Sequence, residues 1–153
     1  MIRAVIDANV LVSGAIVTYG ASAFLVDAIK CRQFLFITCR RNLHEVYRVL
    51  GYRRVCRKYQ VRDRDRKRLV GRLAFIGEFG EPIGRVQICR DPTDDYLIEM
   101  AILGEATHLV TGDEDFHDDP TLLRFLEERG VAAIRPADFV TLLRERTTSG
   151  DTL

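Results

Sequence analysis

Acidic residues in four separate segments of the chain are of the type that binds metal ions or moves protons. Asp7 directly follows a short apolar run, and Asp113 and Asp115 follow a second one. Asp95 opens an amphipathic segment, and Glu45 lies outside the apolar set of another. In open α/β sheets, functional residues gather beyond the carboxyl ends of the strands. If the apolar runs are parallel strands, these carboxylates come to one rim of the sheet.

Bringing such acids together has an electrostatic cost, and this cost limits how many of them can be charged at one rim. Two unit charges about 5 Å apart repel by roughly 3 kcal/mol at an effective dielectric near 20, so four carboxylates, which make six pairs, would oppose folding by on the order of 20 kcal/mol. The acids must therefore spread apart, take up protons, or be neutralised by a cation. A set of oxygen ligands without histidine or cysteine suits Mg²⁺ or Mn²⁺ and suits zinc poorly.

Each acid taken alone also has a purely structural explanation. Asp7 can cap a helix, and Asp95 at a helix start is an ordinary partner of the helix dipole. Glu45 in an amphipathic helix is most often a surface residue. The combination, in which each acid stands where its segment meets the same rim, is what indicates a metal site.

The alternation of short apolar runs and helical periodicities predicts the fold that positions these acids. Continuous runs rich in β-branched residues are typical of buried parallel strands, and apolar residues at three- and four-residue spacing are typical of helices. We expect an α/β fold, a three-layer α/β/α sandwich with a central parallel sheet. The predicted strands are Ile2–Ile6, Phe34–Ile37, Arg85–Ile88, His108–Val110 and Val131–Ile134. The predicted helices are Ser22–Cys31, Asn42–Leu50, Arg64–Phe79, Asp94–Leu103, Pro120–Arg129 and Pro136–Arg146.

Length and composition favour one soluble domain. The chain has 153 residues, of which 47% are hydrophobic and 29% charged. We expect one domain over residues 1–146 and a flexible tail over residues 147–153. The apolar runs are too short to cross a membrane, and no signal peptide is recognisable, so a cytoplasmic protein is expected. The four cysteines form no CxxC pair, which argues against a zinc site and favours reduced thiols.

Charge is distributed unevenly along the chain. Residues 40–72 contain 13 Arg or Lys and 3 acids, a net charge of +10, whereas residues 91–153 contain 5 Arg and 15 acids, a net charge of −10. Such asymmetry is typical of proteins that bind nucleic acid, although a solvated helical face explains the basic run equally well. The residues expected to contact a nucleic-acid backbone are Arg53, Arg54, Arg57, Arg62 and Arg66.

Four segments together resemble the PIN-domain ribonucleases. They are VIDANVLVSG at the N-terminus, the helix with Glu45, CRDPTDDYLIEMA at 89–101 and HLVTGDEDF at 108–116. The similarity covers roughly residues 2–143 and is closest to the bacterial toxins of toxin–antitoxin pairs. It implies a Mg²⁺- or Mn²⁺-binding quartet of Asp7, Glu45, Asp95 and Asp113, with Asp115 as an accessory acid. Asp94 is the second choice for the third acid, because Leu97 and Ile98 follow Asp95 at the family's apolar positions.

The resemblance also implies an activity and partners. The expected reaction is metal-dependent endonucleolytic hydrolysis of RNA, with Asn9 and Thr111 orienting the carboxylates. An antitoxin protein and a homodimer are expected partners. The alternative within the same fold is a module that binds RNA or protein and cuts weakly or not at all. Phosphatases with an aspartyl nucleophile and receiver domains fit poorly, because Asn9 replaces their second aspartate and no lysine occurs after Lys67.

Overall fold

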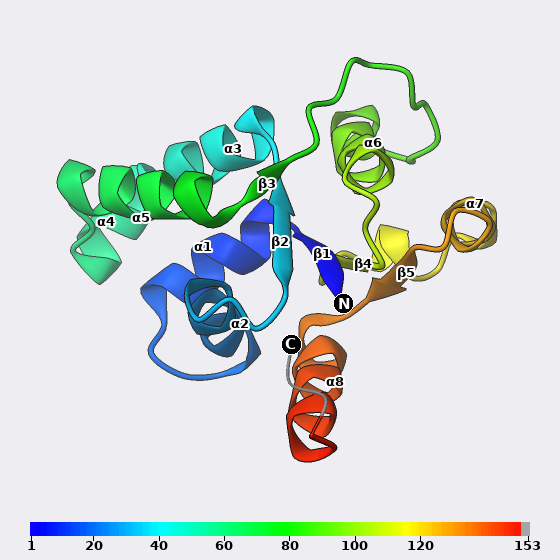
Figure 1. The fold of residues 1–153 in the computed structure, drawn as a ribbon. Coiled ribbons are helices and arrows are strands. Elements are labelled where there is room, and N and C mark those ends of the chain that lie inside the picture. The colour runs from blue at the N-terminus through cyan, green and yellow to red at the C-terminus, as the bar shows by residue number, and fades with distance from the viewer. Residues whose placement is uncertain (151–153) are drawn as a thin grey trace.

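The computed structural model describes residues 1–150, which fold around a five-stranded, all-parallel sheet (Figure 1). The strand order is β3-β2-β1-β4-β5, so the N-terminal strand lies at the centre. The expected parallel sheet is therefore confirmed. The strands are β1 (Arg3–Ile6), β2 (Leu35–Thr38), β3 (Glu78–Phe79), β4 (His108–Val110) and β5 (Ala132–Ile134).

Helices cover both faces of the sheet. The larger apolar core lies between the sheet and α1, α2, α3, α5 and α8, and a second core lies between the opposite face and α6 and α7. The α-helices are α1 (Ala8–Ile16), α2 (Ala21–Lys30), α3 (Arg40–Leu50), α4 (Arg53–Tyr59), α5 (Asp63–Ile76), α6 (Asp95–Leu103), α7 (Pro120–Glu127) and α8 (Pro136–Thr148), and the short 3-10 turns are η1 (Pro92–Asp94) and η2 (Glu114–Phe116). This is the three-layer sandwich that the sequence predicts.

The strands alternate between the two cores as the pleat requires. On β1, Ala4 and Ile6 face the larger core, while Val5 faces the smaller one. All three are fully buried, which explains why the strand reads as one continuous apolar run.

One predicted strand is wrong, and its error has a physical cause. Residues 85–88 form no strand but belong to an irregular segment between β3 and η1, here called the 80–91 loop. Val86 and Ile88 pack against the smaller core from outside the sheet. The sheet edge is instead Glu78–Phe79, placed by sequence at the end of a helix that actually ends at Ile76.

Other differences concern helices. Helices α1 and α4 are not among the predicted helices, although α1 begins immediately after Asp7, where a helix cap was one interpretation of that residue. Helix α8 continues to Thr148, so the first two residues of the expected tail are helical, while residues 151–153 lie outside the described residues. No single helix in residues 1–150 is long and apolar enough to cross a membrane; α1 and α2 reach the length only as a pair bent by 96°.

Candidate metal centre

Asp7 and Asp113 meet at the carboxyl ends of two neighbouring strands. The N–H of Asp7 donates to the carbonyl of Val110 at 2.9 Å, which continues the β1–β4 ladder. The hydroxyl of the fully buried Thr111 donates to Asp7 Oδ2 at 2.8 Å and accepts from the Asp113 N–H at 3.1 Å. Thr111 therefore holds both acids at the same point of the rim.

The Asp7 carboxylate is buried, with 9% of the residue exposed. Burial raises the pKa of Asp7, and the charge of Asp113 adds to this, while hydrogen bonds from Thr111 and the Asn9 N–H act against it. Asp7 also caps α1, accepting from the Asn9 N–H at 3.4 Å. Asp7 thus caps α1 and also belongs to the candidate metal centre. Asn9 contributes its backbone, and its side chain is exposed.

Asp94 lies within electrostatic range of the other acids at this rim. Burial and the charges of Asp91, Asp7, Asp113 and Asp115 raise the pKa of Asp94 to about 6. Its carboxylate makes no capping hydrogen bond to α6. A half-buried carboxylate among like charges favours either a proton or a cation.

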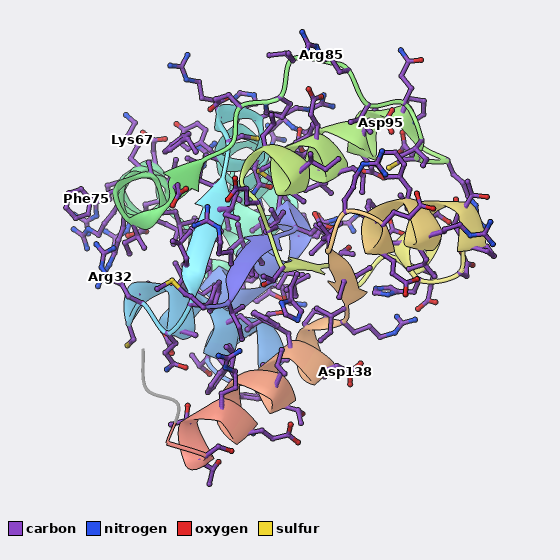
Figure 2. The ribbon with its side chains drawn as sticks, turned by 45° about the vertical axis from the view of Figure 1, so that its right-hand side comes forward. Arg32, Lys67, Phe75, Arg85, Asp95 and Asp138 are labelled. Carbon is purple, nitrogen blue, oxygen red and sulfur yellow. The ribbon has the colours of Figure 1, made fainter. Side chains whose placement is uncertain are left out.

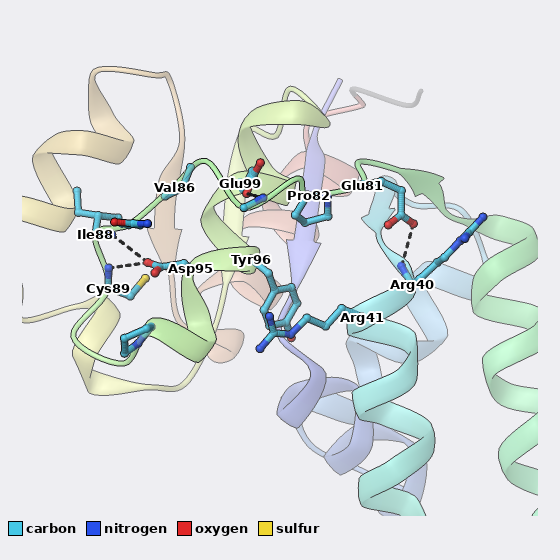
Figure 3. Close-up of a pocket in the computed structure, with 13 residues that line it drawn as sticks. Arg40, Arg41, Glu81, Pro82, Val86, Ile88, Cys89, Asp95, Tyr96 and Glu99 are labelled. Carbon is cyan, nitrogen blue, oxygen red and sulfur yellow. Dashed lines mark hydrogen bonds between the residues drawn. The ribbon is translucent and has the colours of Figure 1, made fainter.

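Asp95 is engaged elsewhere. Its Oδ1 accepts from the N–H groups of Ile88 and Cys89, at 3.0 and 2.8 Å (Figure 3). These bonds fasten the 80–91 loop to the start of α6. The geometry therefore favours Asp94 over Asp95 as the third acid. The apolar residues Leu97 and Ile98 had favoured Asp95 in the sequence.

Glu45 lies on α3 and forms an ion pair with Arg48 at 2.8 Å. This hydrogen bond with Arg48 lowers the pKa of Glu45, so the carboxylate is ionised at neutral pH. Burial raises the pKa of the Tyr96 hydroxyl, and the charges of Asp7 and Glu45 raise it further. The charges of Glu45 on α3 and of Asp7 before α1 thus both raise the pKa of the Tyr96 hydroxyl.

Asp115 stands at the outer side of the same rim. Its N–H donates to Asp113 Oδ1 at 3.0 Å, and its carboxylate pairs with Arg90 at 3.2 Å. Arg90 also pairs with Asp118 at 2.8 Å. Sequence reasoning missed Arg90, because it comes from the 80–91 loop and its acidic partners lie 25 and 28 residues further along the chain.

A buried polar network connects three elements beneath the rim, and sequence reasoning missed it too. The fully buried Asn42 on α3 donates to the carbonyl of Ile6 at 3.1 Å, directly before Asp7. The Tyr96 hydroxyl on α6 donates to Asn42 Oδ1 at 3.4 Å. The network fixes α3 and α6 against the end of β1, and so fixes the elements that carry the acids.

The donor set fits a hard divalent cation that keeps part of its water shell. Within residues 1–150, no three Asp, Glu, His or Cys side chains are positioned to chelate one ion by themselves. The acids nevertheless gather closely enough that Asp7, Asp113 and Asp115 all act on the pKa of Asp94. Mg²⁺ commonly binds one or two carboxylates and completes its shell with waters and substrate phosphates.

The basic residues divide into two groups. Arg53, Arg54 and Arg57 lie exposed on α4, which buries none of its residues. Arg66 on α5 is 17% exposed, lies over the Tyr47 ring at 3.8 Å, and donates twice to the Tyr47 carbonyl. Arg66 thus holds α5 to α3 and is not free for RNA.

Arg62, the remaining basic residue of that set, lies exposed at the start of α5. It is 3.8 Å from Asp65, in a surface ion pair of the kind that contributes little to stability.

Comparison with known proteins identifies one family. A sequence model described as the PIN domain matches residues 3–115, which include every acid of the candidate centre. No curated protein and no solved structure matches the chain.

Proposed function

The chain belongs to the PIN domain family, and from this membership and the acidic rim we propose that it is a Mg²⁺- or Mn²⁺-dependent endoribonuclease. Members of this family are generally metal-dependent nucleases. The observation that carries the proposal is the junction of Asp7, Thr111 and Asp113, whose charges also raise the pKa of Asp94.

The residues have distinct roles in this proposal. Asp7, Asp94 and Asp113 would hold the cation, which would supply Lewis-acid activation of water and neutralise charge on the scissile phosphate. Thr111 keeps the Asp7 carboxylate oriented, as hydrogen-bond partners of metal ligands commonly do. Glu45, ionised on the neighbouring helix, orients the attacking water.

We propose further that α4 holds the RNA backbone. Among residues 1–150, no carboxylate pairs with Arg53, Arg54 or Arg57, whereas Arg66 and Lys67 of α5 both pair with Asp63. Unpaired cations are free to replace the counterions of a phosphate backbone, and such contacts position RNA without reading its sequence.

The toxin role is a finer proposal that rests on the resemblance of the four acidic segments to toxins of toxin–antitoxin pairs. Induced expression in a bacterial host is expected to stop growth with the wild type and not with Asp7→Asn. An antitoxin encoded beside the gene is expected to restore growth when co-expressed. A homodimer is proposed on the same resemblance, and sedimentation equilibrium tests it.

One observation favours a weakly active binding module as the second candidate. Glu45 and Asp115 are each paired with an arginine, Arg48 and Arg90 respectively. If these pairs persist when RNA is bound, both acids stay out of the reaction, and the domain binds RNA without cutting it efficiently.

Cleavage of a fluorescent single-stranded RNA in Mg²⁺ or Mn²⁺ separates the two candidates. The nuclease proposal expects cleavage by the wild type, loss of cleavage in EDTA, and loss in Asp7→Asn. Asparagine caps helices about as well as aspartate, so this variant keeps the α1 cap. Asp27→Asn, an exposed acid on α2, is the matched control. Undiminished cleavage by Asp7→Asn refutes the metal site, and RNA binding without cleavage by the wild type supports the module.

A further inference from the structure

A cavity formed by described residues lies beside the acidic rim and has no role in the metal centre. It has a volume of about 760 Å³, within the range typical of small-molecule sites. The start of α3, the 80–91 loop and the start of α6 surround it (Figure 3). Its walls are mainly apolar, from Pro82, Val86, Ile88, Pro92 and Tyr96.

The loop that forms one wall is held in place by two carboxylates. Glu99, 5% exposed, accepts from the N–H groups of Ile83, Gly84 and Arg85 at 2.8, 3.0 and 3.2 Å. Asp95 holds the far end of the loop in the same way. Figure 2 shows Arg85 on the outer side of the loop and Asp95 on the helix below it. The cavity is therefore built by fixed hydrogen bonds.

Positive charge stands at the mouth of the cavity. Arg41 lies over the Tyr96 ring at 4.5 Å and donates to the Thr93 carbonyl at 3.0 Å. Arg40 precedes it on α3, and its backbone N–H donates to Glu81 at 2.9 Å. Among the described residues, neither guanidinium forms an ion pair with a carboxylate. Arg40 and Arg41 are both exposed, so each can meet an anion even though Arg41 also contacts Tyr96 and Thr93.

Tyr96 links the cavity to the rim by hydrogen bonds, because Asn42, which accepts from its hydroxyl, donates to the carbonyl of Ile6 directly before Asp7. This residue lines the cavity, its hydroxyl reaches Asn42, and the charges of Asp7 and Glu45 act on it. Asp95, another lining residue, directly follows Asp94. A nucleic-acid strand bound at the acids can therefore place its next nucleotide in the cavity.

We propose that this cavity binds one unpaired base of single-stranded RNA next to the cleaved bond. The base stacks on the guanidinium plane of Arg41 between the apolar walls, and Arg40 meets the adjoining phosphate. Sequence-specific recognition of RNA commonly uses unstacked bases held on aromatic rings or arginine planes in this way. The proposal rests on the proposed nuclease function, and it makes the substrate single-stranded at this position.

Titration with a nucleoside monophosphate in EDTA tests the cavity without any cleavage. Adenosine and uridine 5′-monophosphates are added to the ¹⁵N-labelled protein, with inorganic phosphate as the reference. We expect the amides of residues 80–91 to shift with the nucleotides. Val86→Trp, which fills the cavity, and Arg41→Ala are each expected to weaken binding about fivefold to a hundredfold, as for the loss of one base stack.

Matched variants and a separate assay keep the outcomes distinct. Ile83→Trp, exposed on the same loop, and Arg64→Ala, exposed on α5, are expected to bind as the wild type does. Equal nucleotide affinity in Val86→Trp and the wild type overturns the proposal, as does equal affinity for inorganic phosphate and nucleotide. Failure of the nuclease proposal appears in the Asp7→Asn cleavage assay instead, which does not depend on this titration.

Discussion

The hydroxyl of Thr111 donates to Asp7 Oδ2 at 2.8 Å and so joins the carboxyl ends of β4 and β1 through one buried contact. The bond stabilises the ionised form of a carboxyl whose pKa is raised by burial. It therefore favours the charge state that binds a cation.

Thr111→Val removes this donor while keeping the shape of the side chain. The pKa of Asp7 is expected to rise further, so protons compete better with the cation. Affinity for Mn²⁺ is expected to fall about tenfold to a hundredfold, as for other lost partners of metal ligands, and to fall more at low pH. Calorimetric titration at two pH values measures this. Thr111→Ser keeps the hydroxyl and should restore affinity; identical affinities in all three proteins contradict the role.

The choice between the adjacent acids Asp94 and Asp95 is tested by a pair of asparagine variants. Asp94→Asn is expected to abolish metal-dependent cleavage, because it removes a carboxylate within electrostatic range of the other acids. Asp95→Asn keeps an oxygen that can accept from Ile88 and Cys89, so it should leave cleavage within a few fold of the wild type. Rates under single-turnover conditions measure the difference. If Asp95→Asn loses cleavage and Asp94→Asn keeps it, Asp95 is the third acid of the metal centre.

The raised pKa of Asp94 predicts how the stability of the metal-free protein depends on pH. The pKa is raised by burial and neighbouring acids from an ordinary value near 3.8 to about 6, so the folded state holds this proton more tightly than the unfolded state. Stability contributed by the protonated form is complete below pH about 4, declines as pH rises to about 6, and is absent above. Thermal unfolding in EDTA should therefore show a lower midpoint at pH 7 than at pH 5.

Two controls isolate the acids in that experiment. Added Mg²⁺ and the substitution Asp94→Asn should each reduce the pH dependence, because each removes uncompensated charge at the rim. Asp27→Asn, away from the rim, should leave it unchanged. An Asp94→Asn protein with the full wild-type dependence contradicts the electrostatic account.

The two groups of arginines are expected to separate in RNA binding. Arg57→Ala, from the exposed face of α4, should reduce the slope of log affinity against log salt by about 0.7, the value for one phosphate contact on a single strand. Arg66→Ala should leave the slope unchanged and destabilise the fold by about 2 kcal/mol, because it breaks two hydrogen bonds to the Tyr47 carbonyl. Fluorescence anisotropy at four salt concentrations and denaturant unfolding measure the two effects.

Glu99 is expected to be the main anchor of the 80–91 loop. Burial acts to raise the pKa of Glu99, but N–H donors from Ile83, Arg85 and Gly84 outweigh it and hold the pKa below its usual range. Glu99→Ala leaves three donors without this acceptor and should destabilise the fold by about 2 kcal/mol or more. Hydrogen exchange at the three amides should accelerate. Unchanged exchange there would mean that the loop is held by its apolar contacts alone.

The parts of the fold that sequence predicts well are those with strong periodicity. The strand His108–Val110 has the predicted bounds, and Ile2–Ile6 differs by one residue, because both strands end in two fully buried apolar residues. A different pattern misled at Arg85–Ile88. Val86 and Ile88 alternate with polar residues as in a strand, but they pack on helices while carboxylates of α6 take up the backbone donors of the loop.

The position of the acids in the chain predicts that they lie at the rim. It does not decide which of the adjacent residues Asp94 and Asp95 is the third acid. Asp7 and Asp113 follow paired strands, so topology alone brings them together. Asp94 and Asp95 differ by one residue at a helix start, where about 100° of rotation sends one carboxylate to the rim and the other to the loop. The direction in which each carboxylate points depends on how α6 packs against the sheet. The Asn42–Tyr96 bond, which helps to set it, joins residues 54 positions apart.

The two-residue length of β3 has a consequence for how the molecule behaves in concentrated solution. A long, flat edge strand offers unpaired backbone groups on which another chain can assemble. Here that border is only Glu78–Phe79, and the carboxylate of Glu78 is neutralised by Arg3 at 2.7 Å within the same molecule. So short an edge provides little template for intermolecular β-pairing, so fibrillar assembly is disfavoured at the β3 side of the sheet.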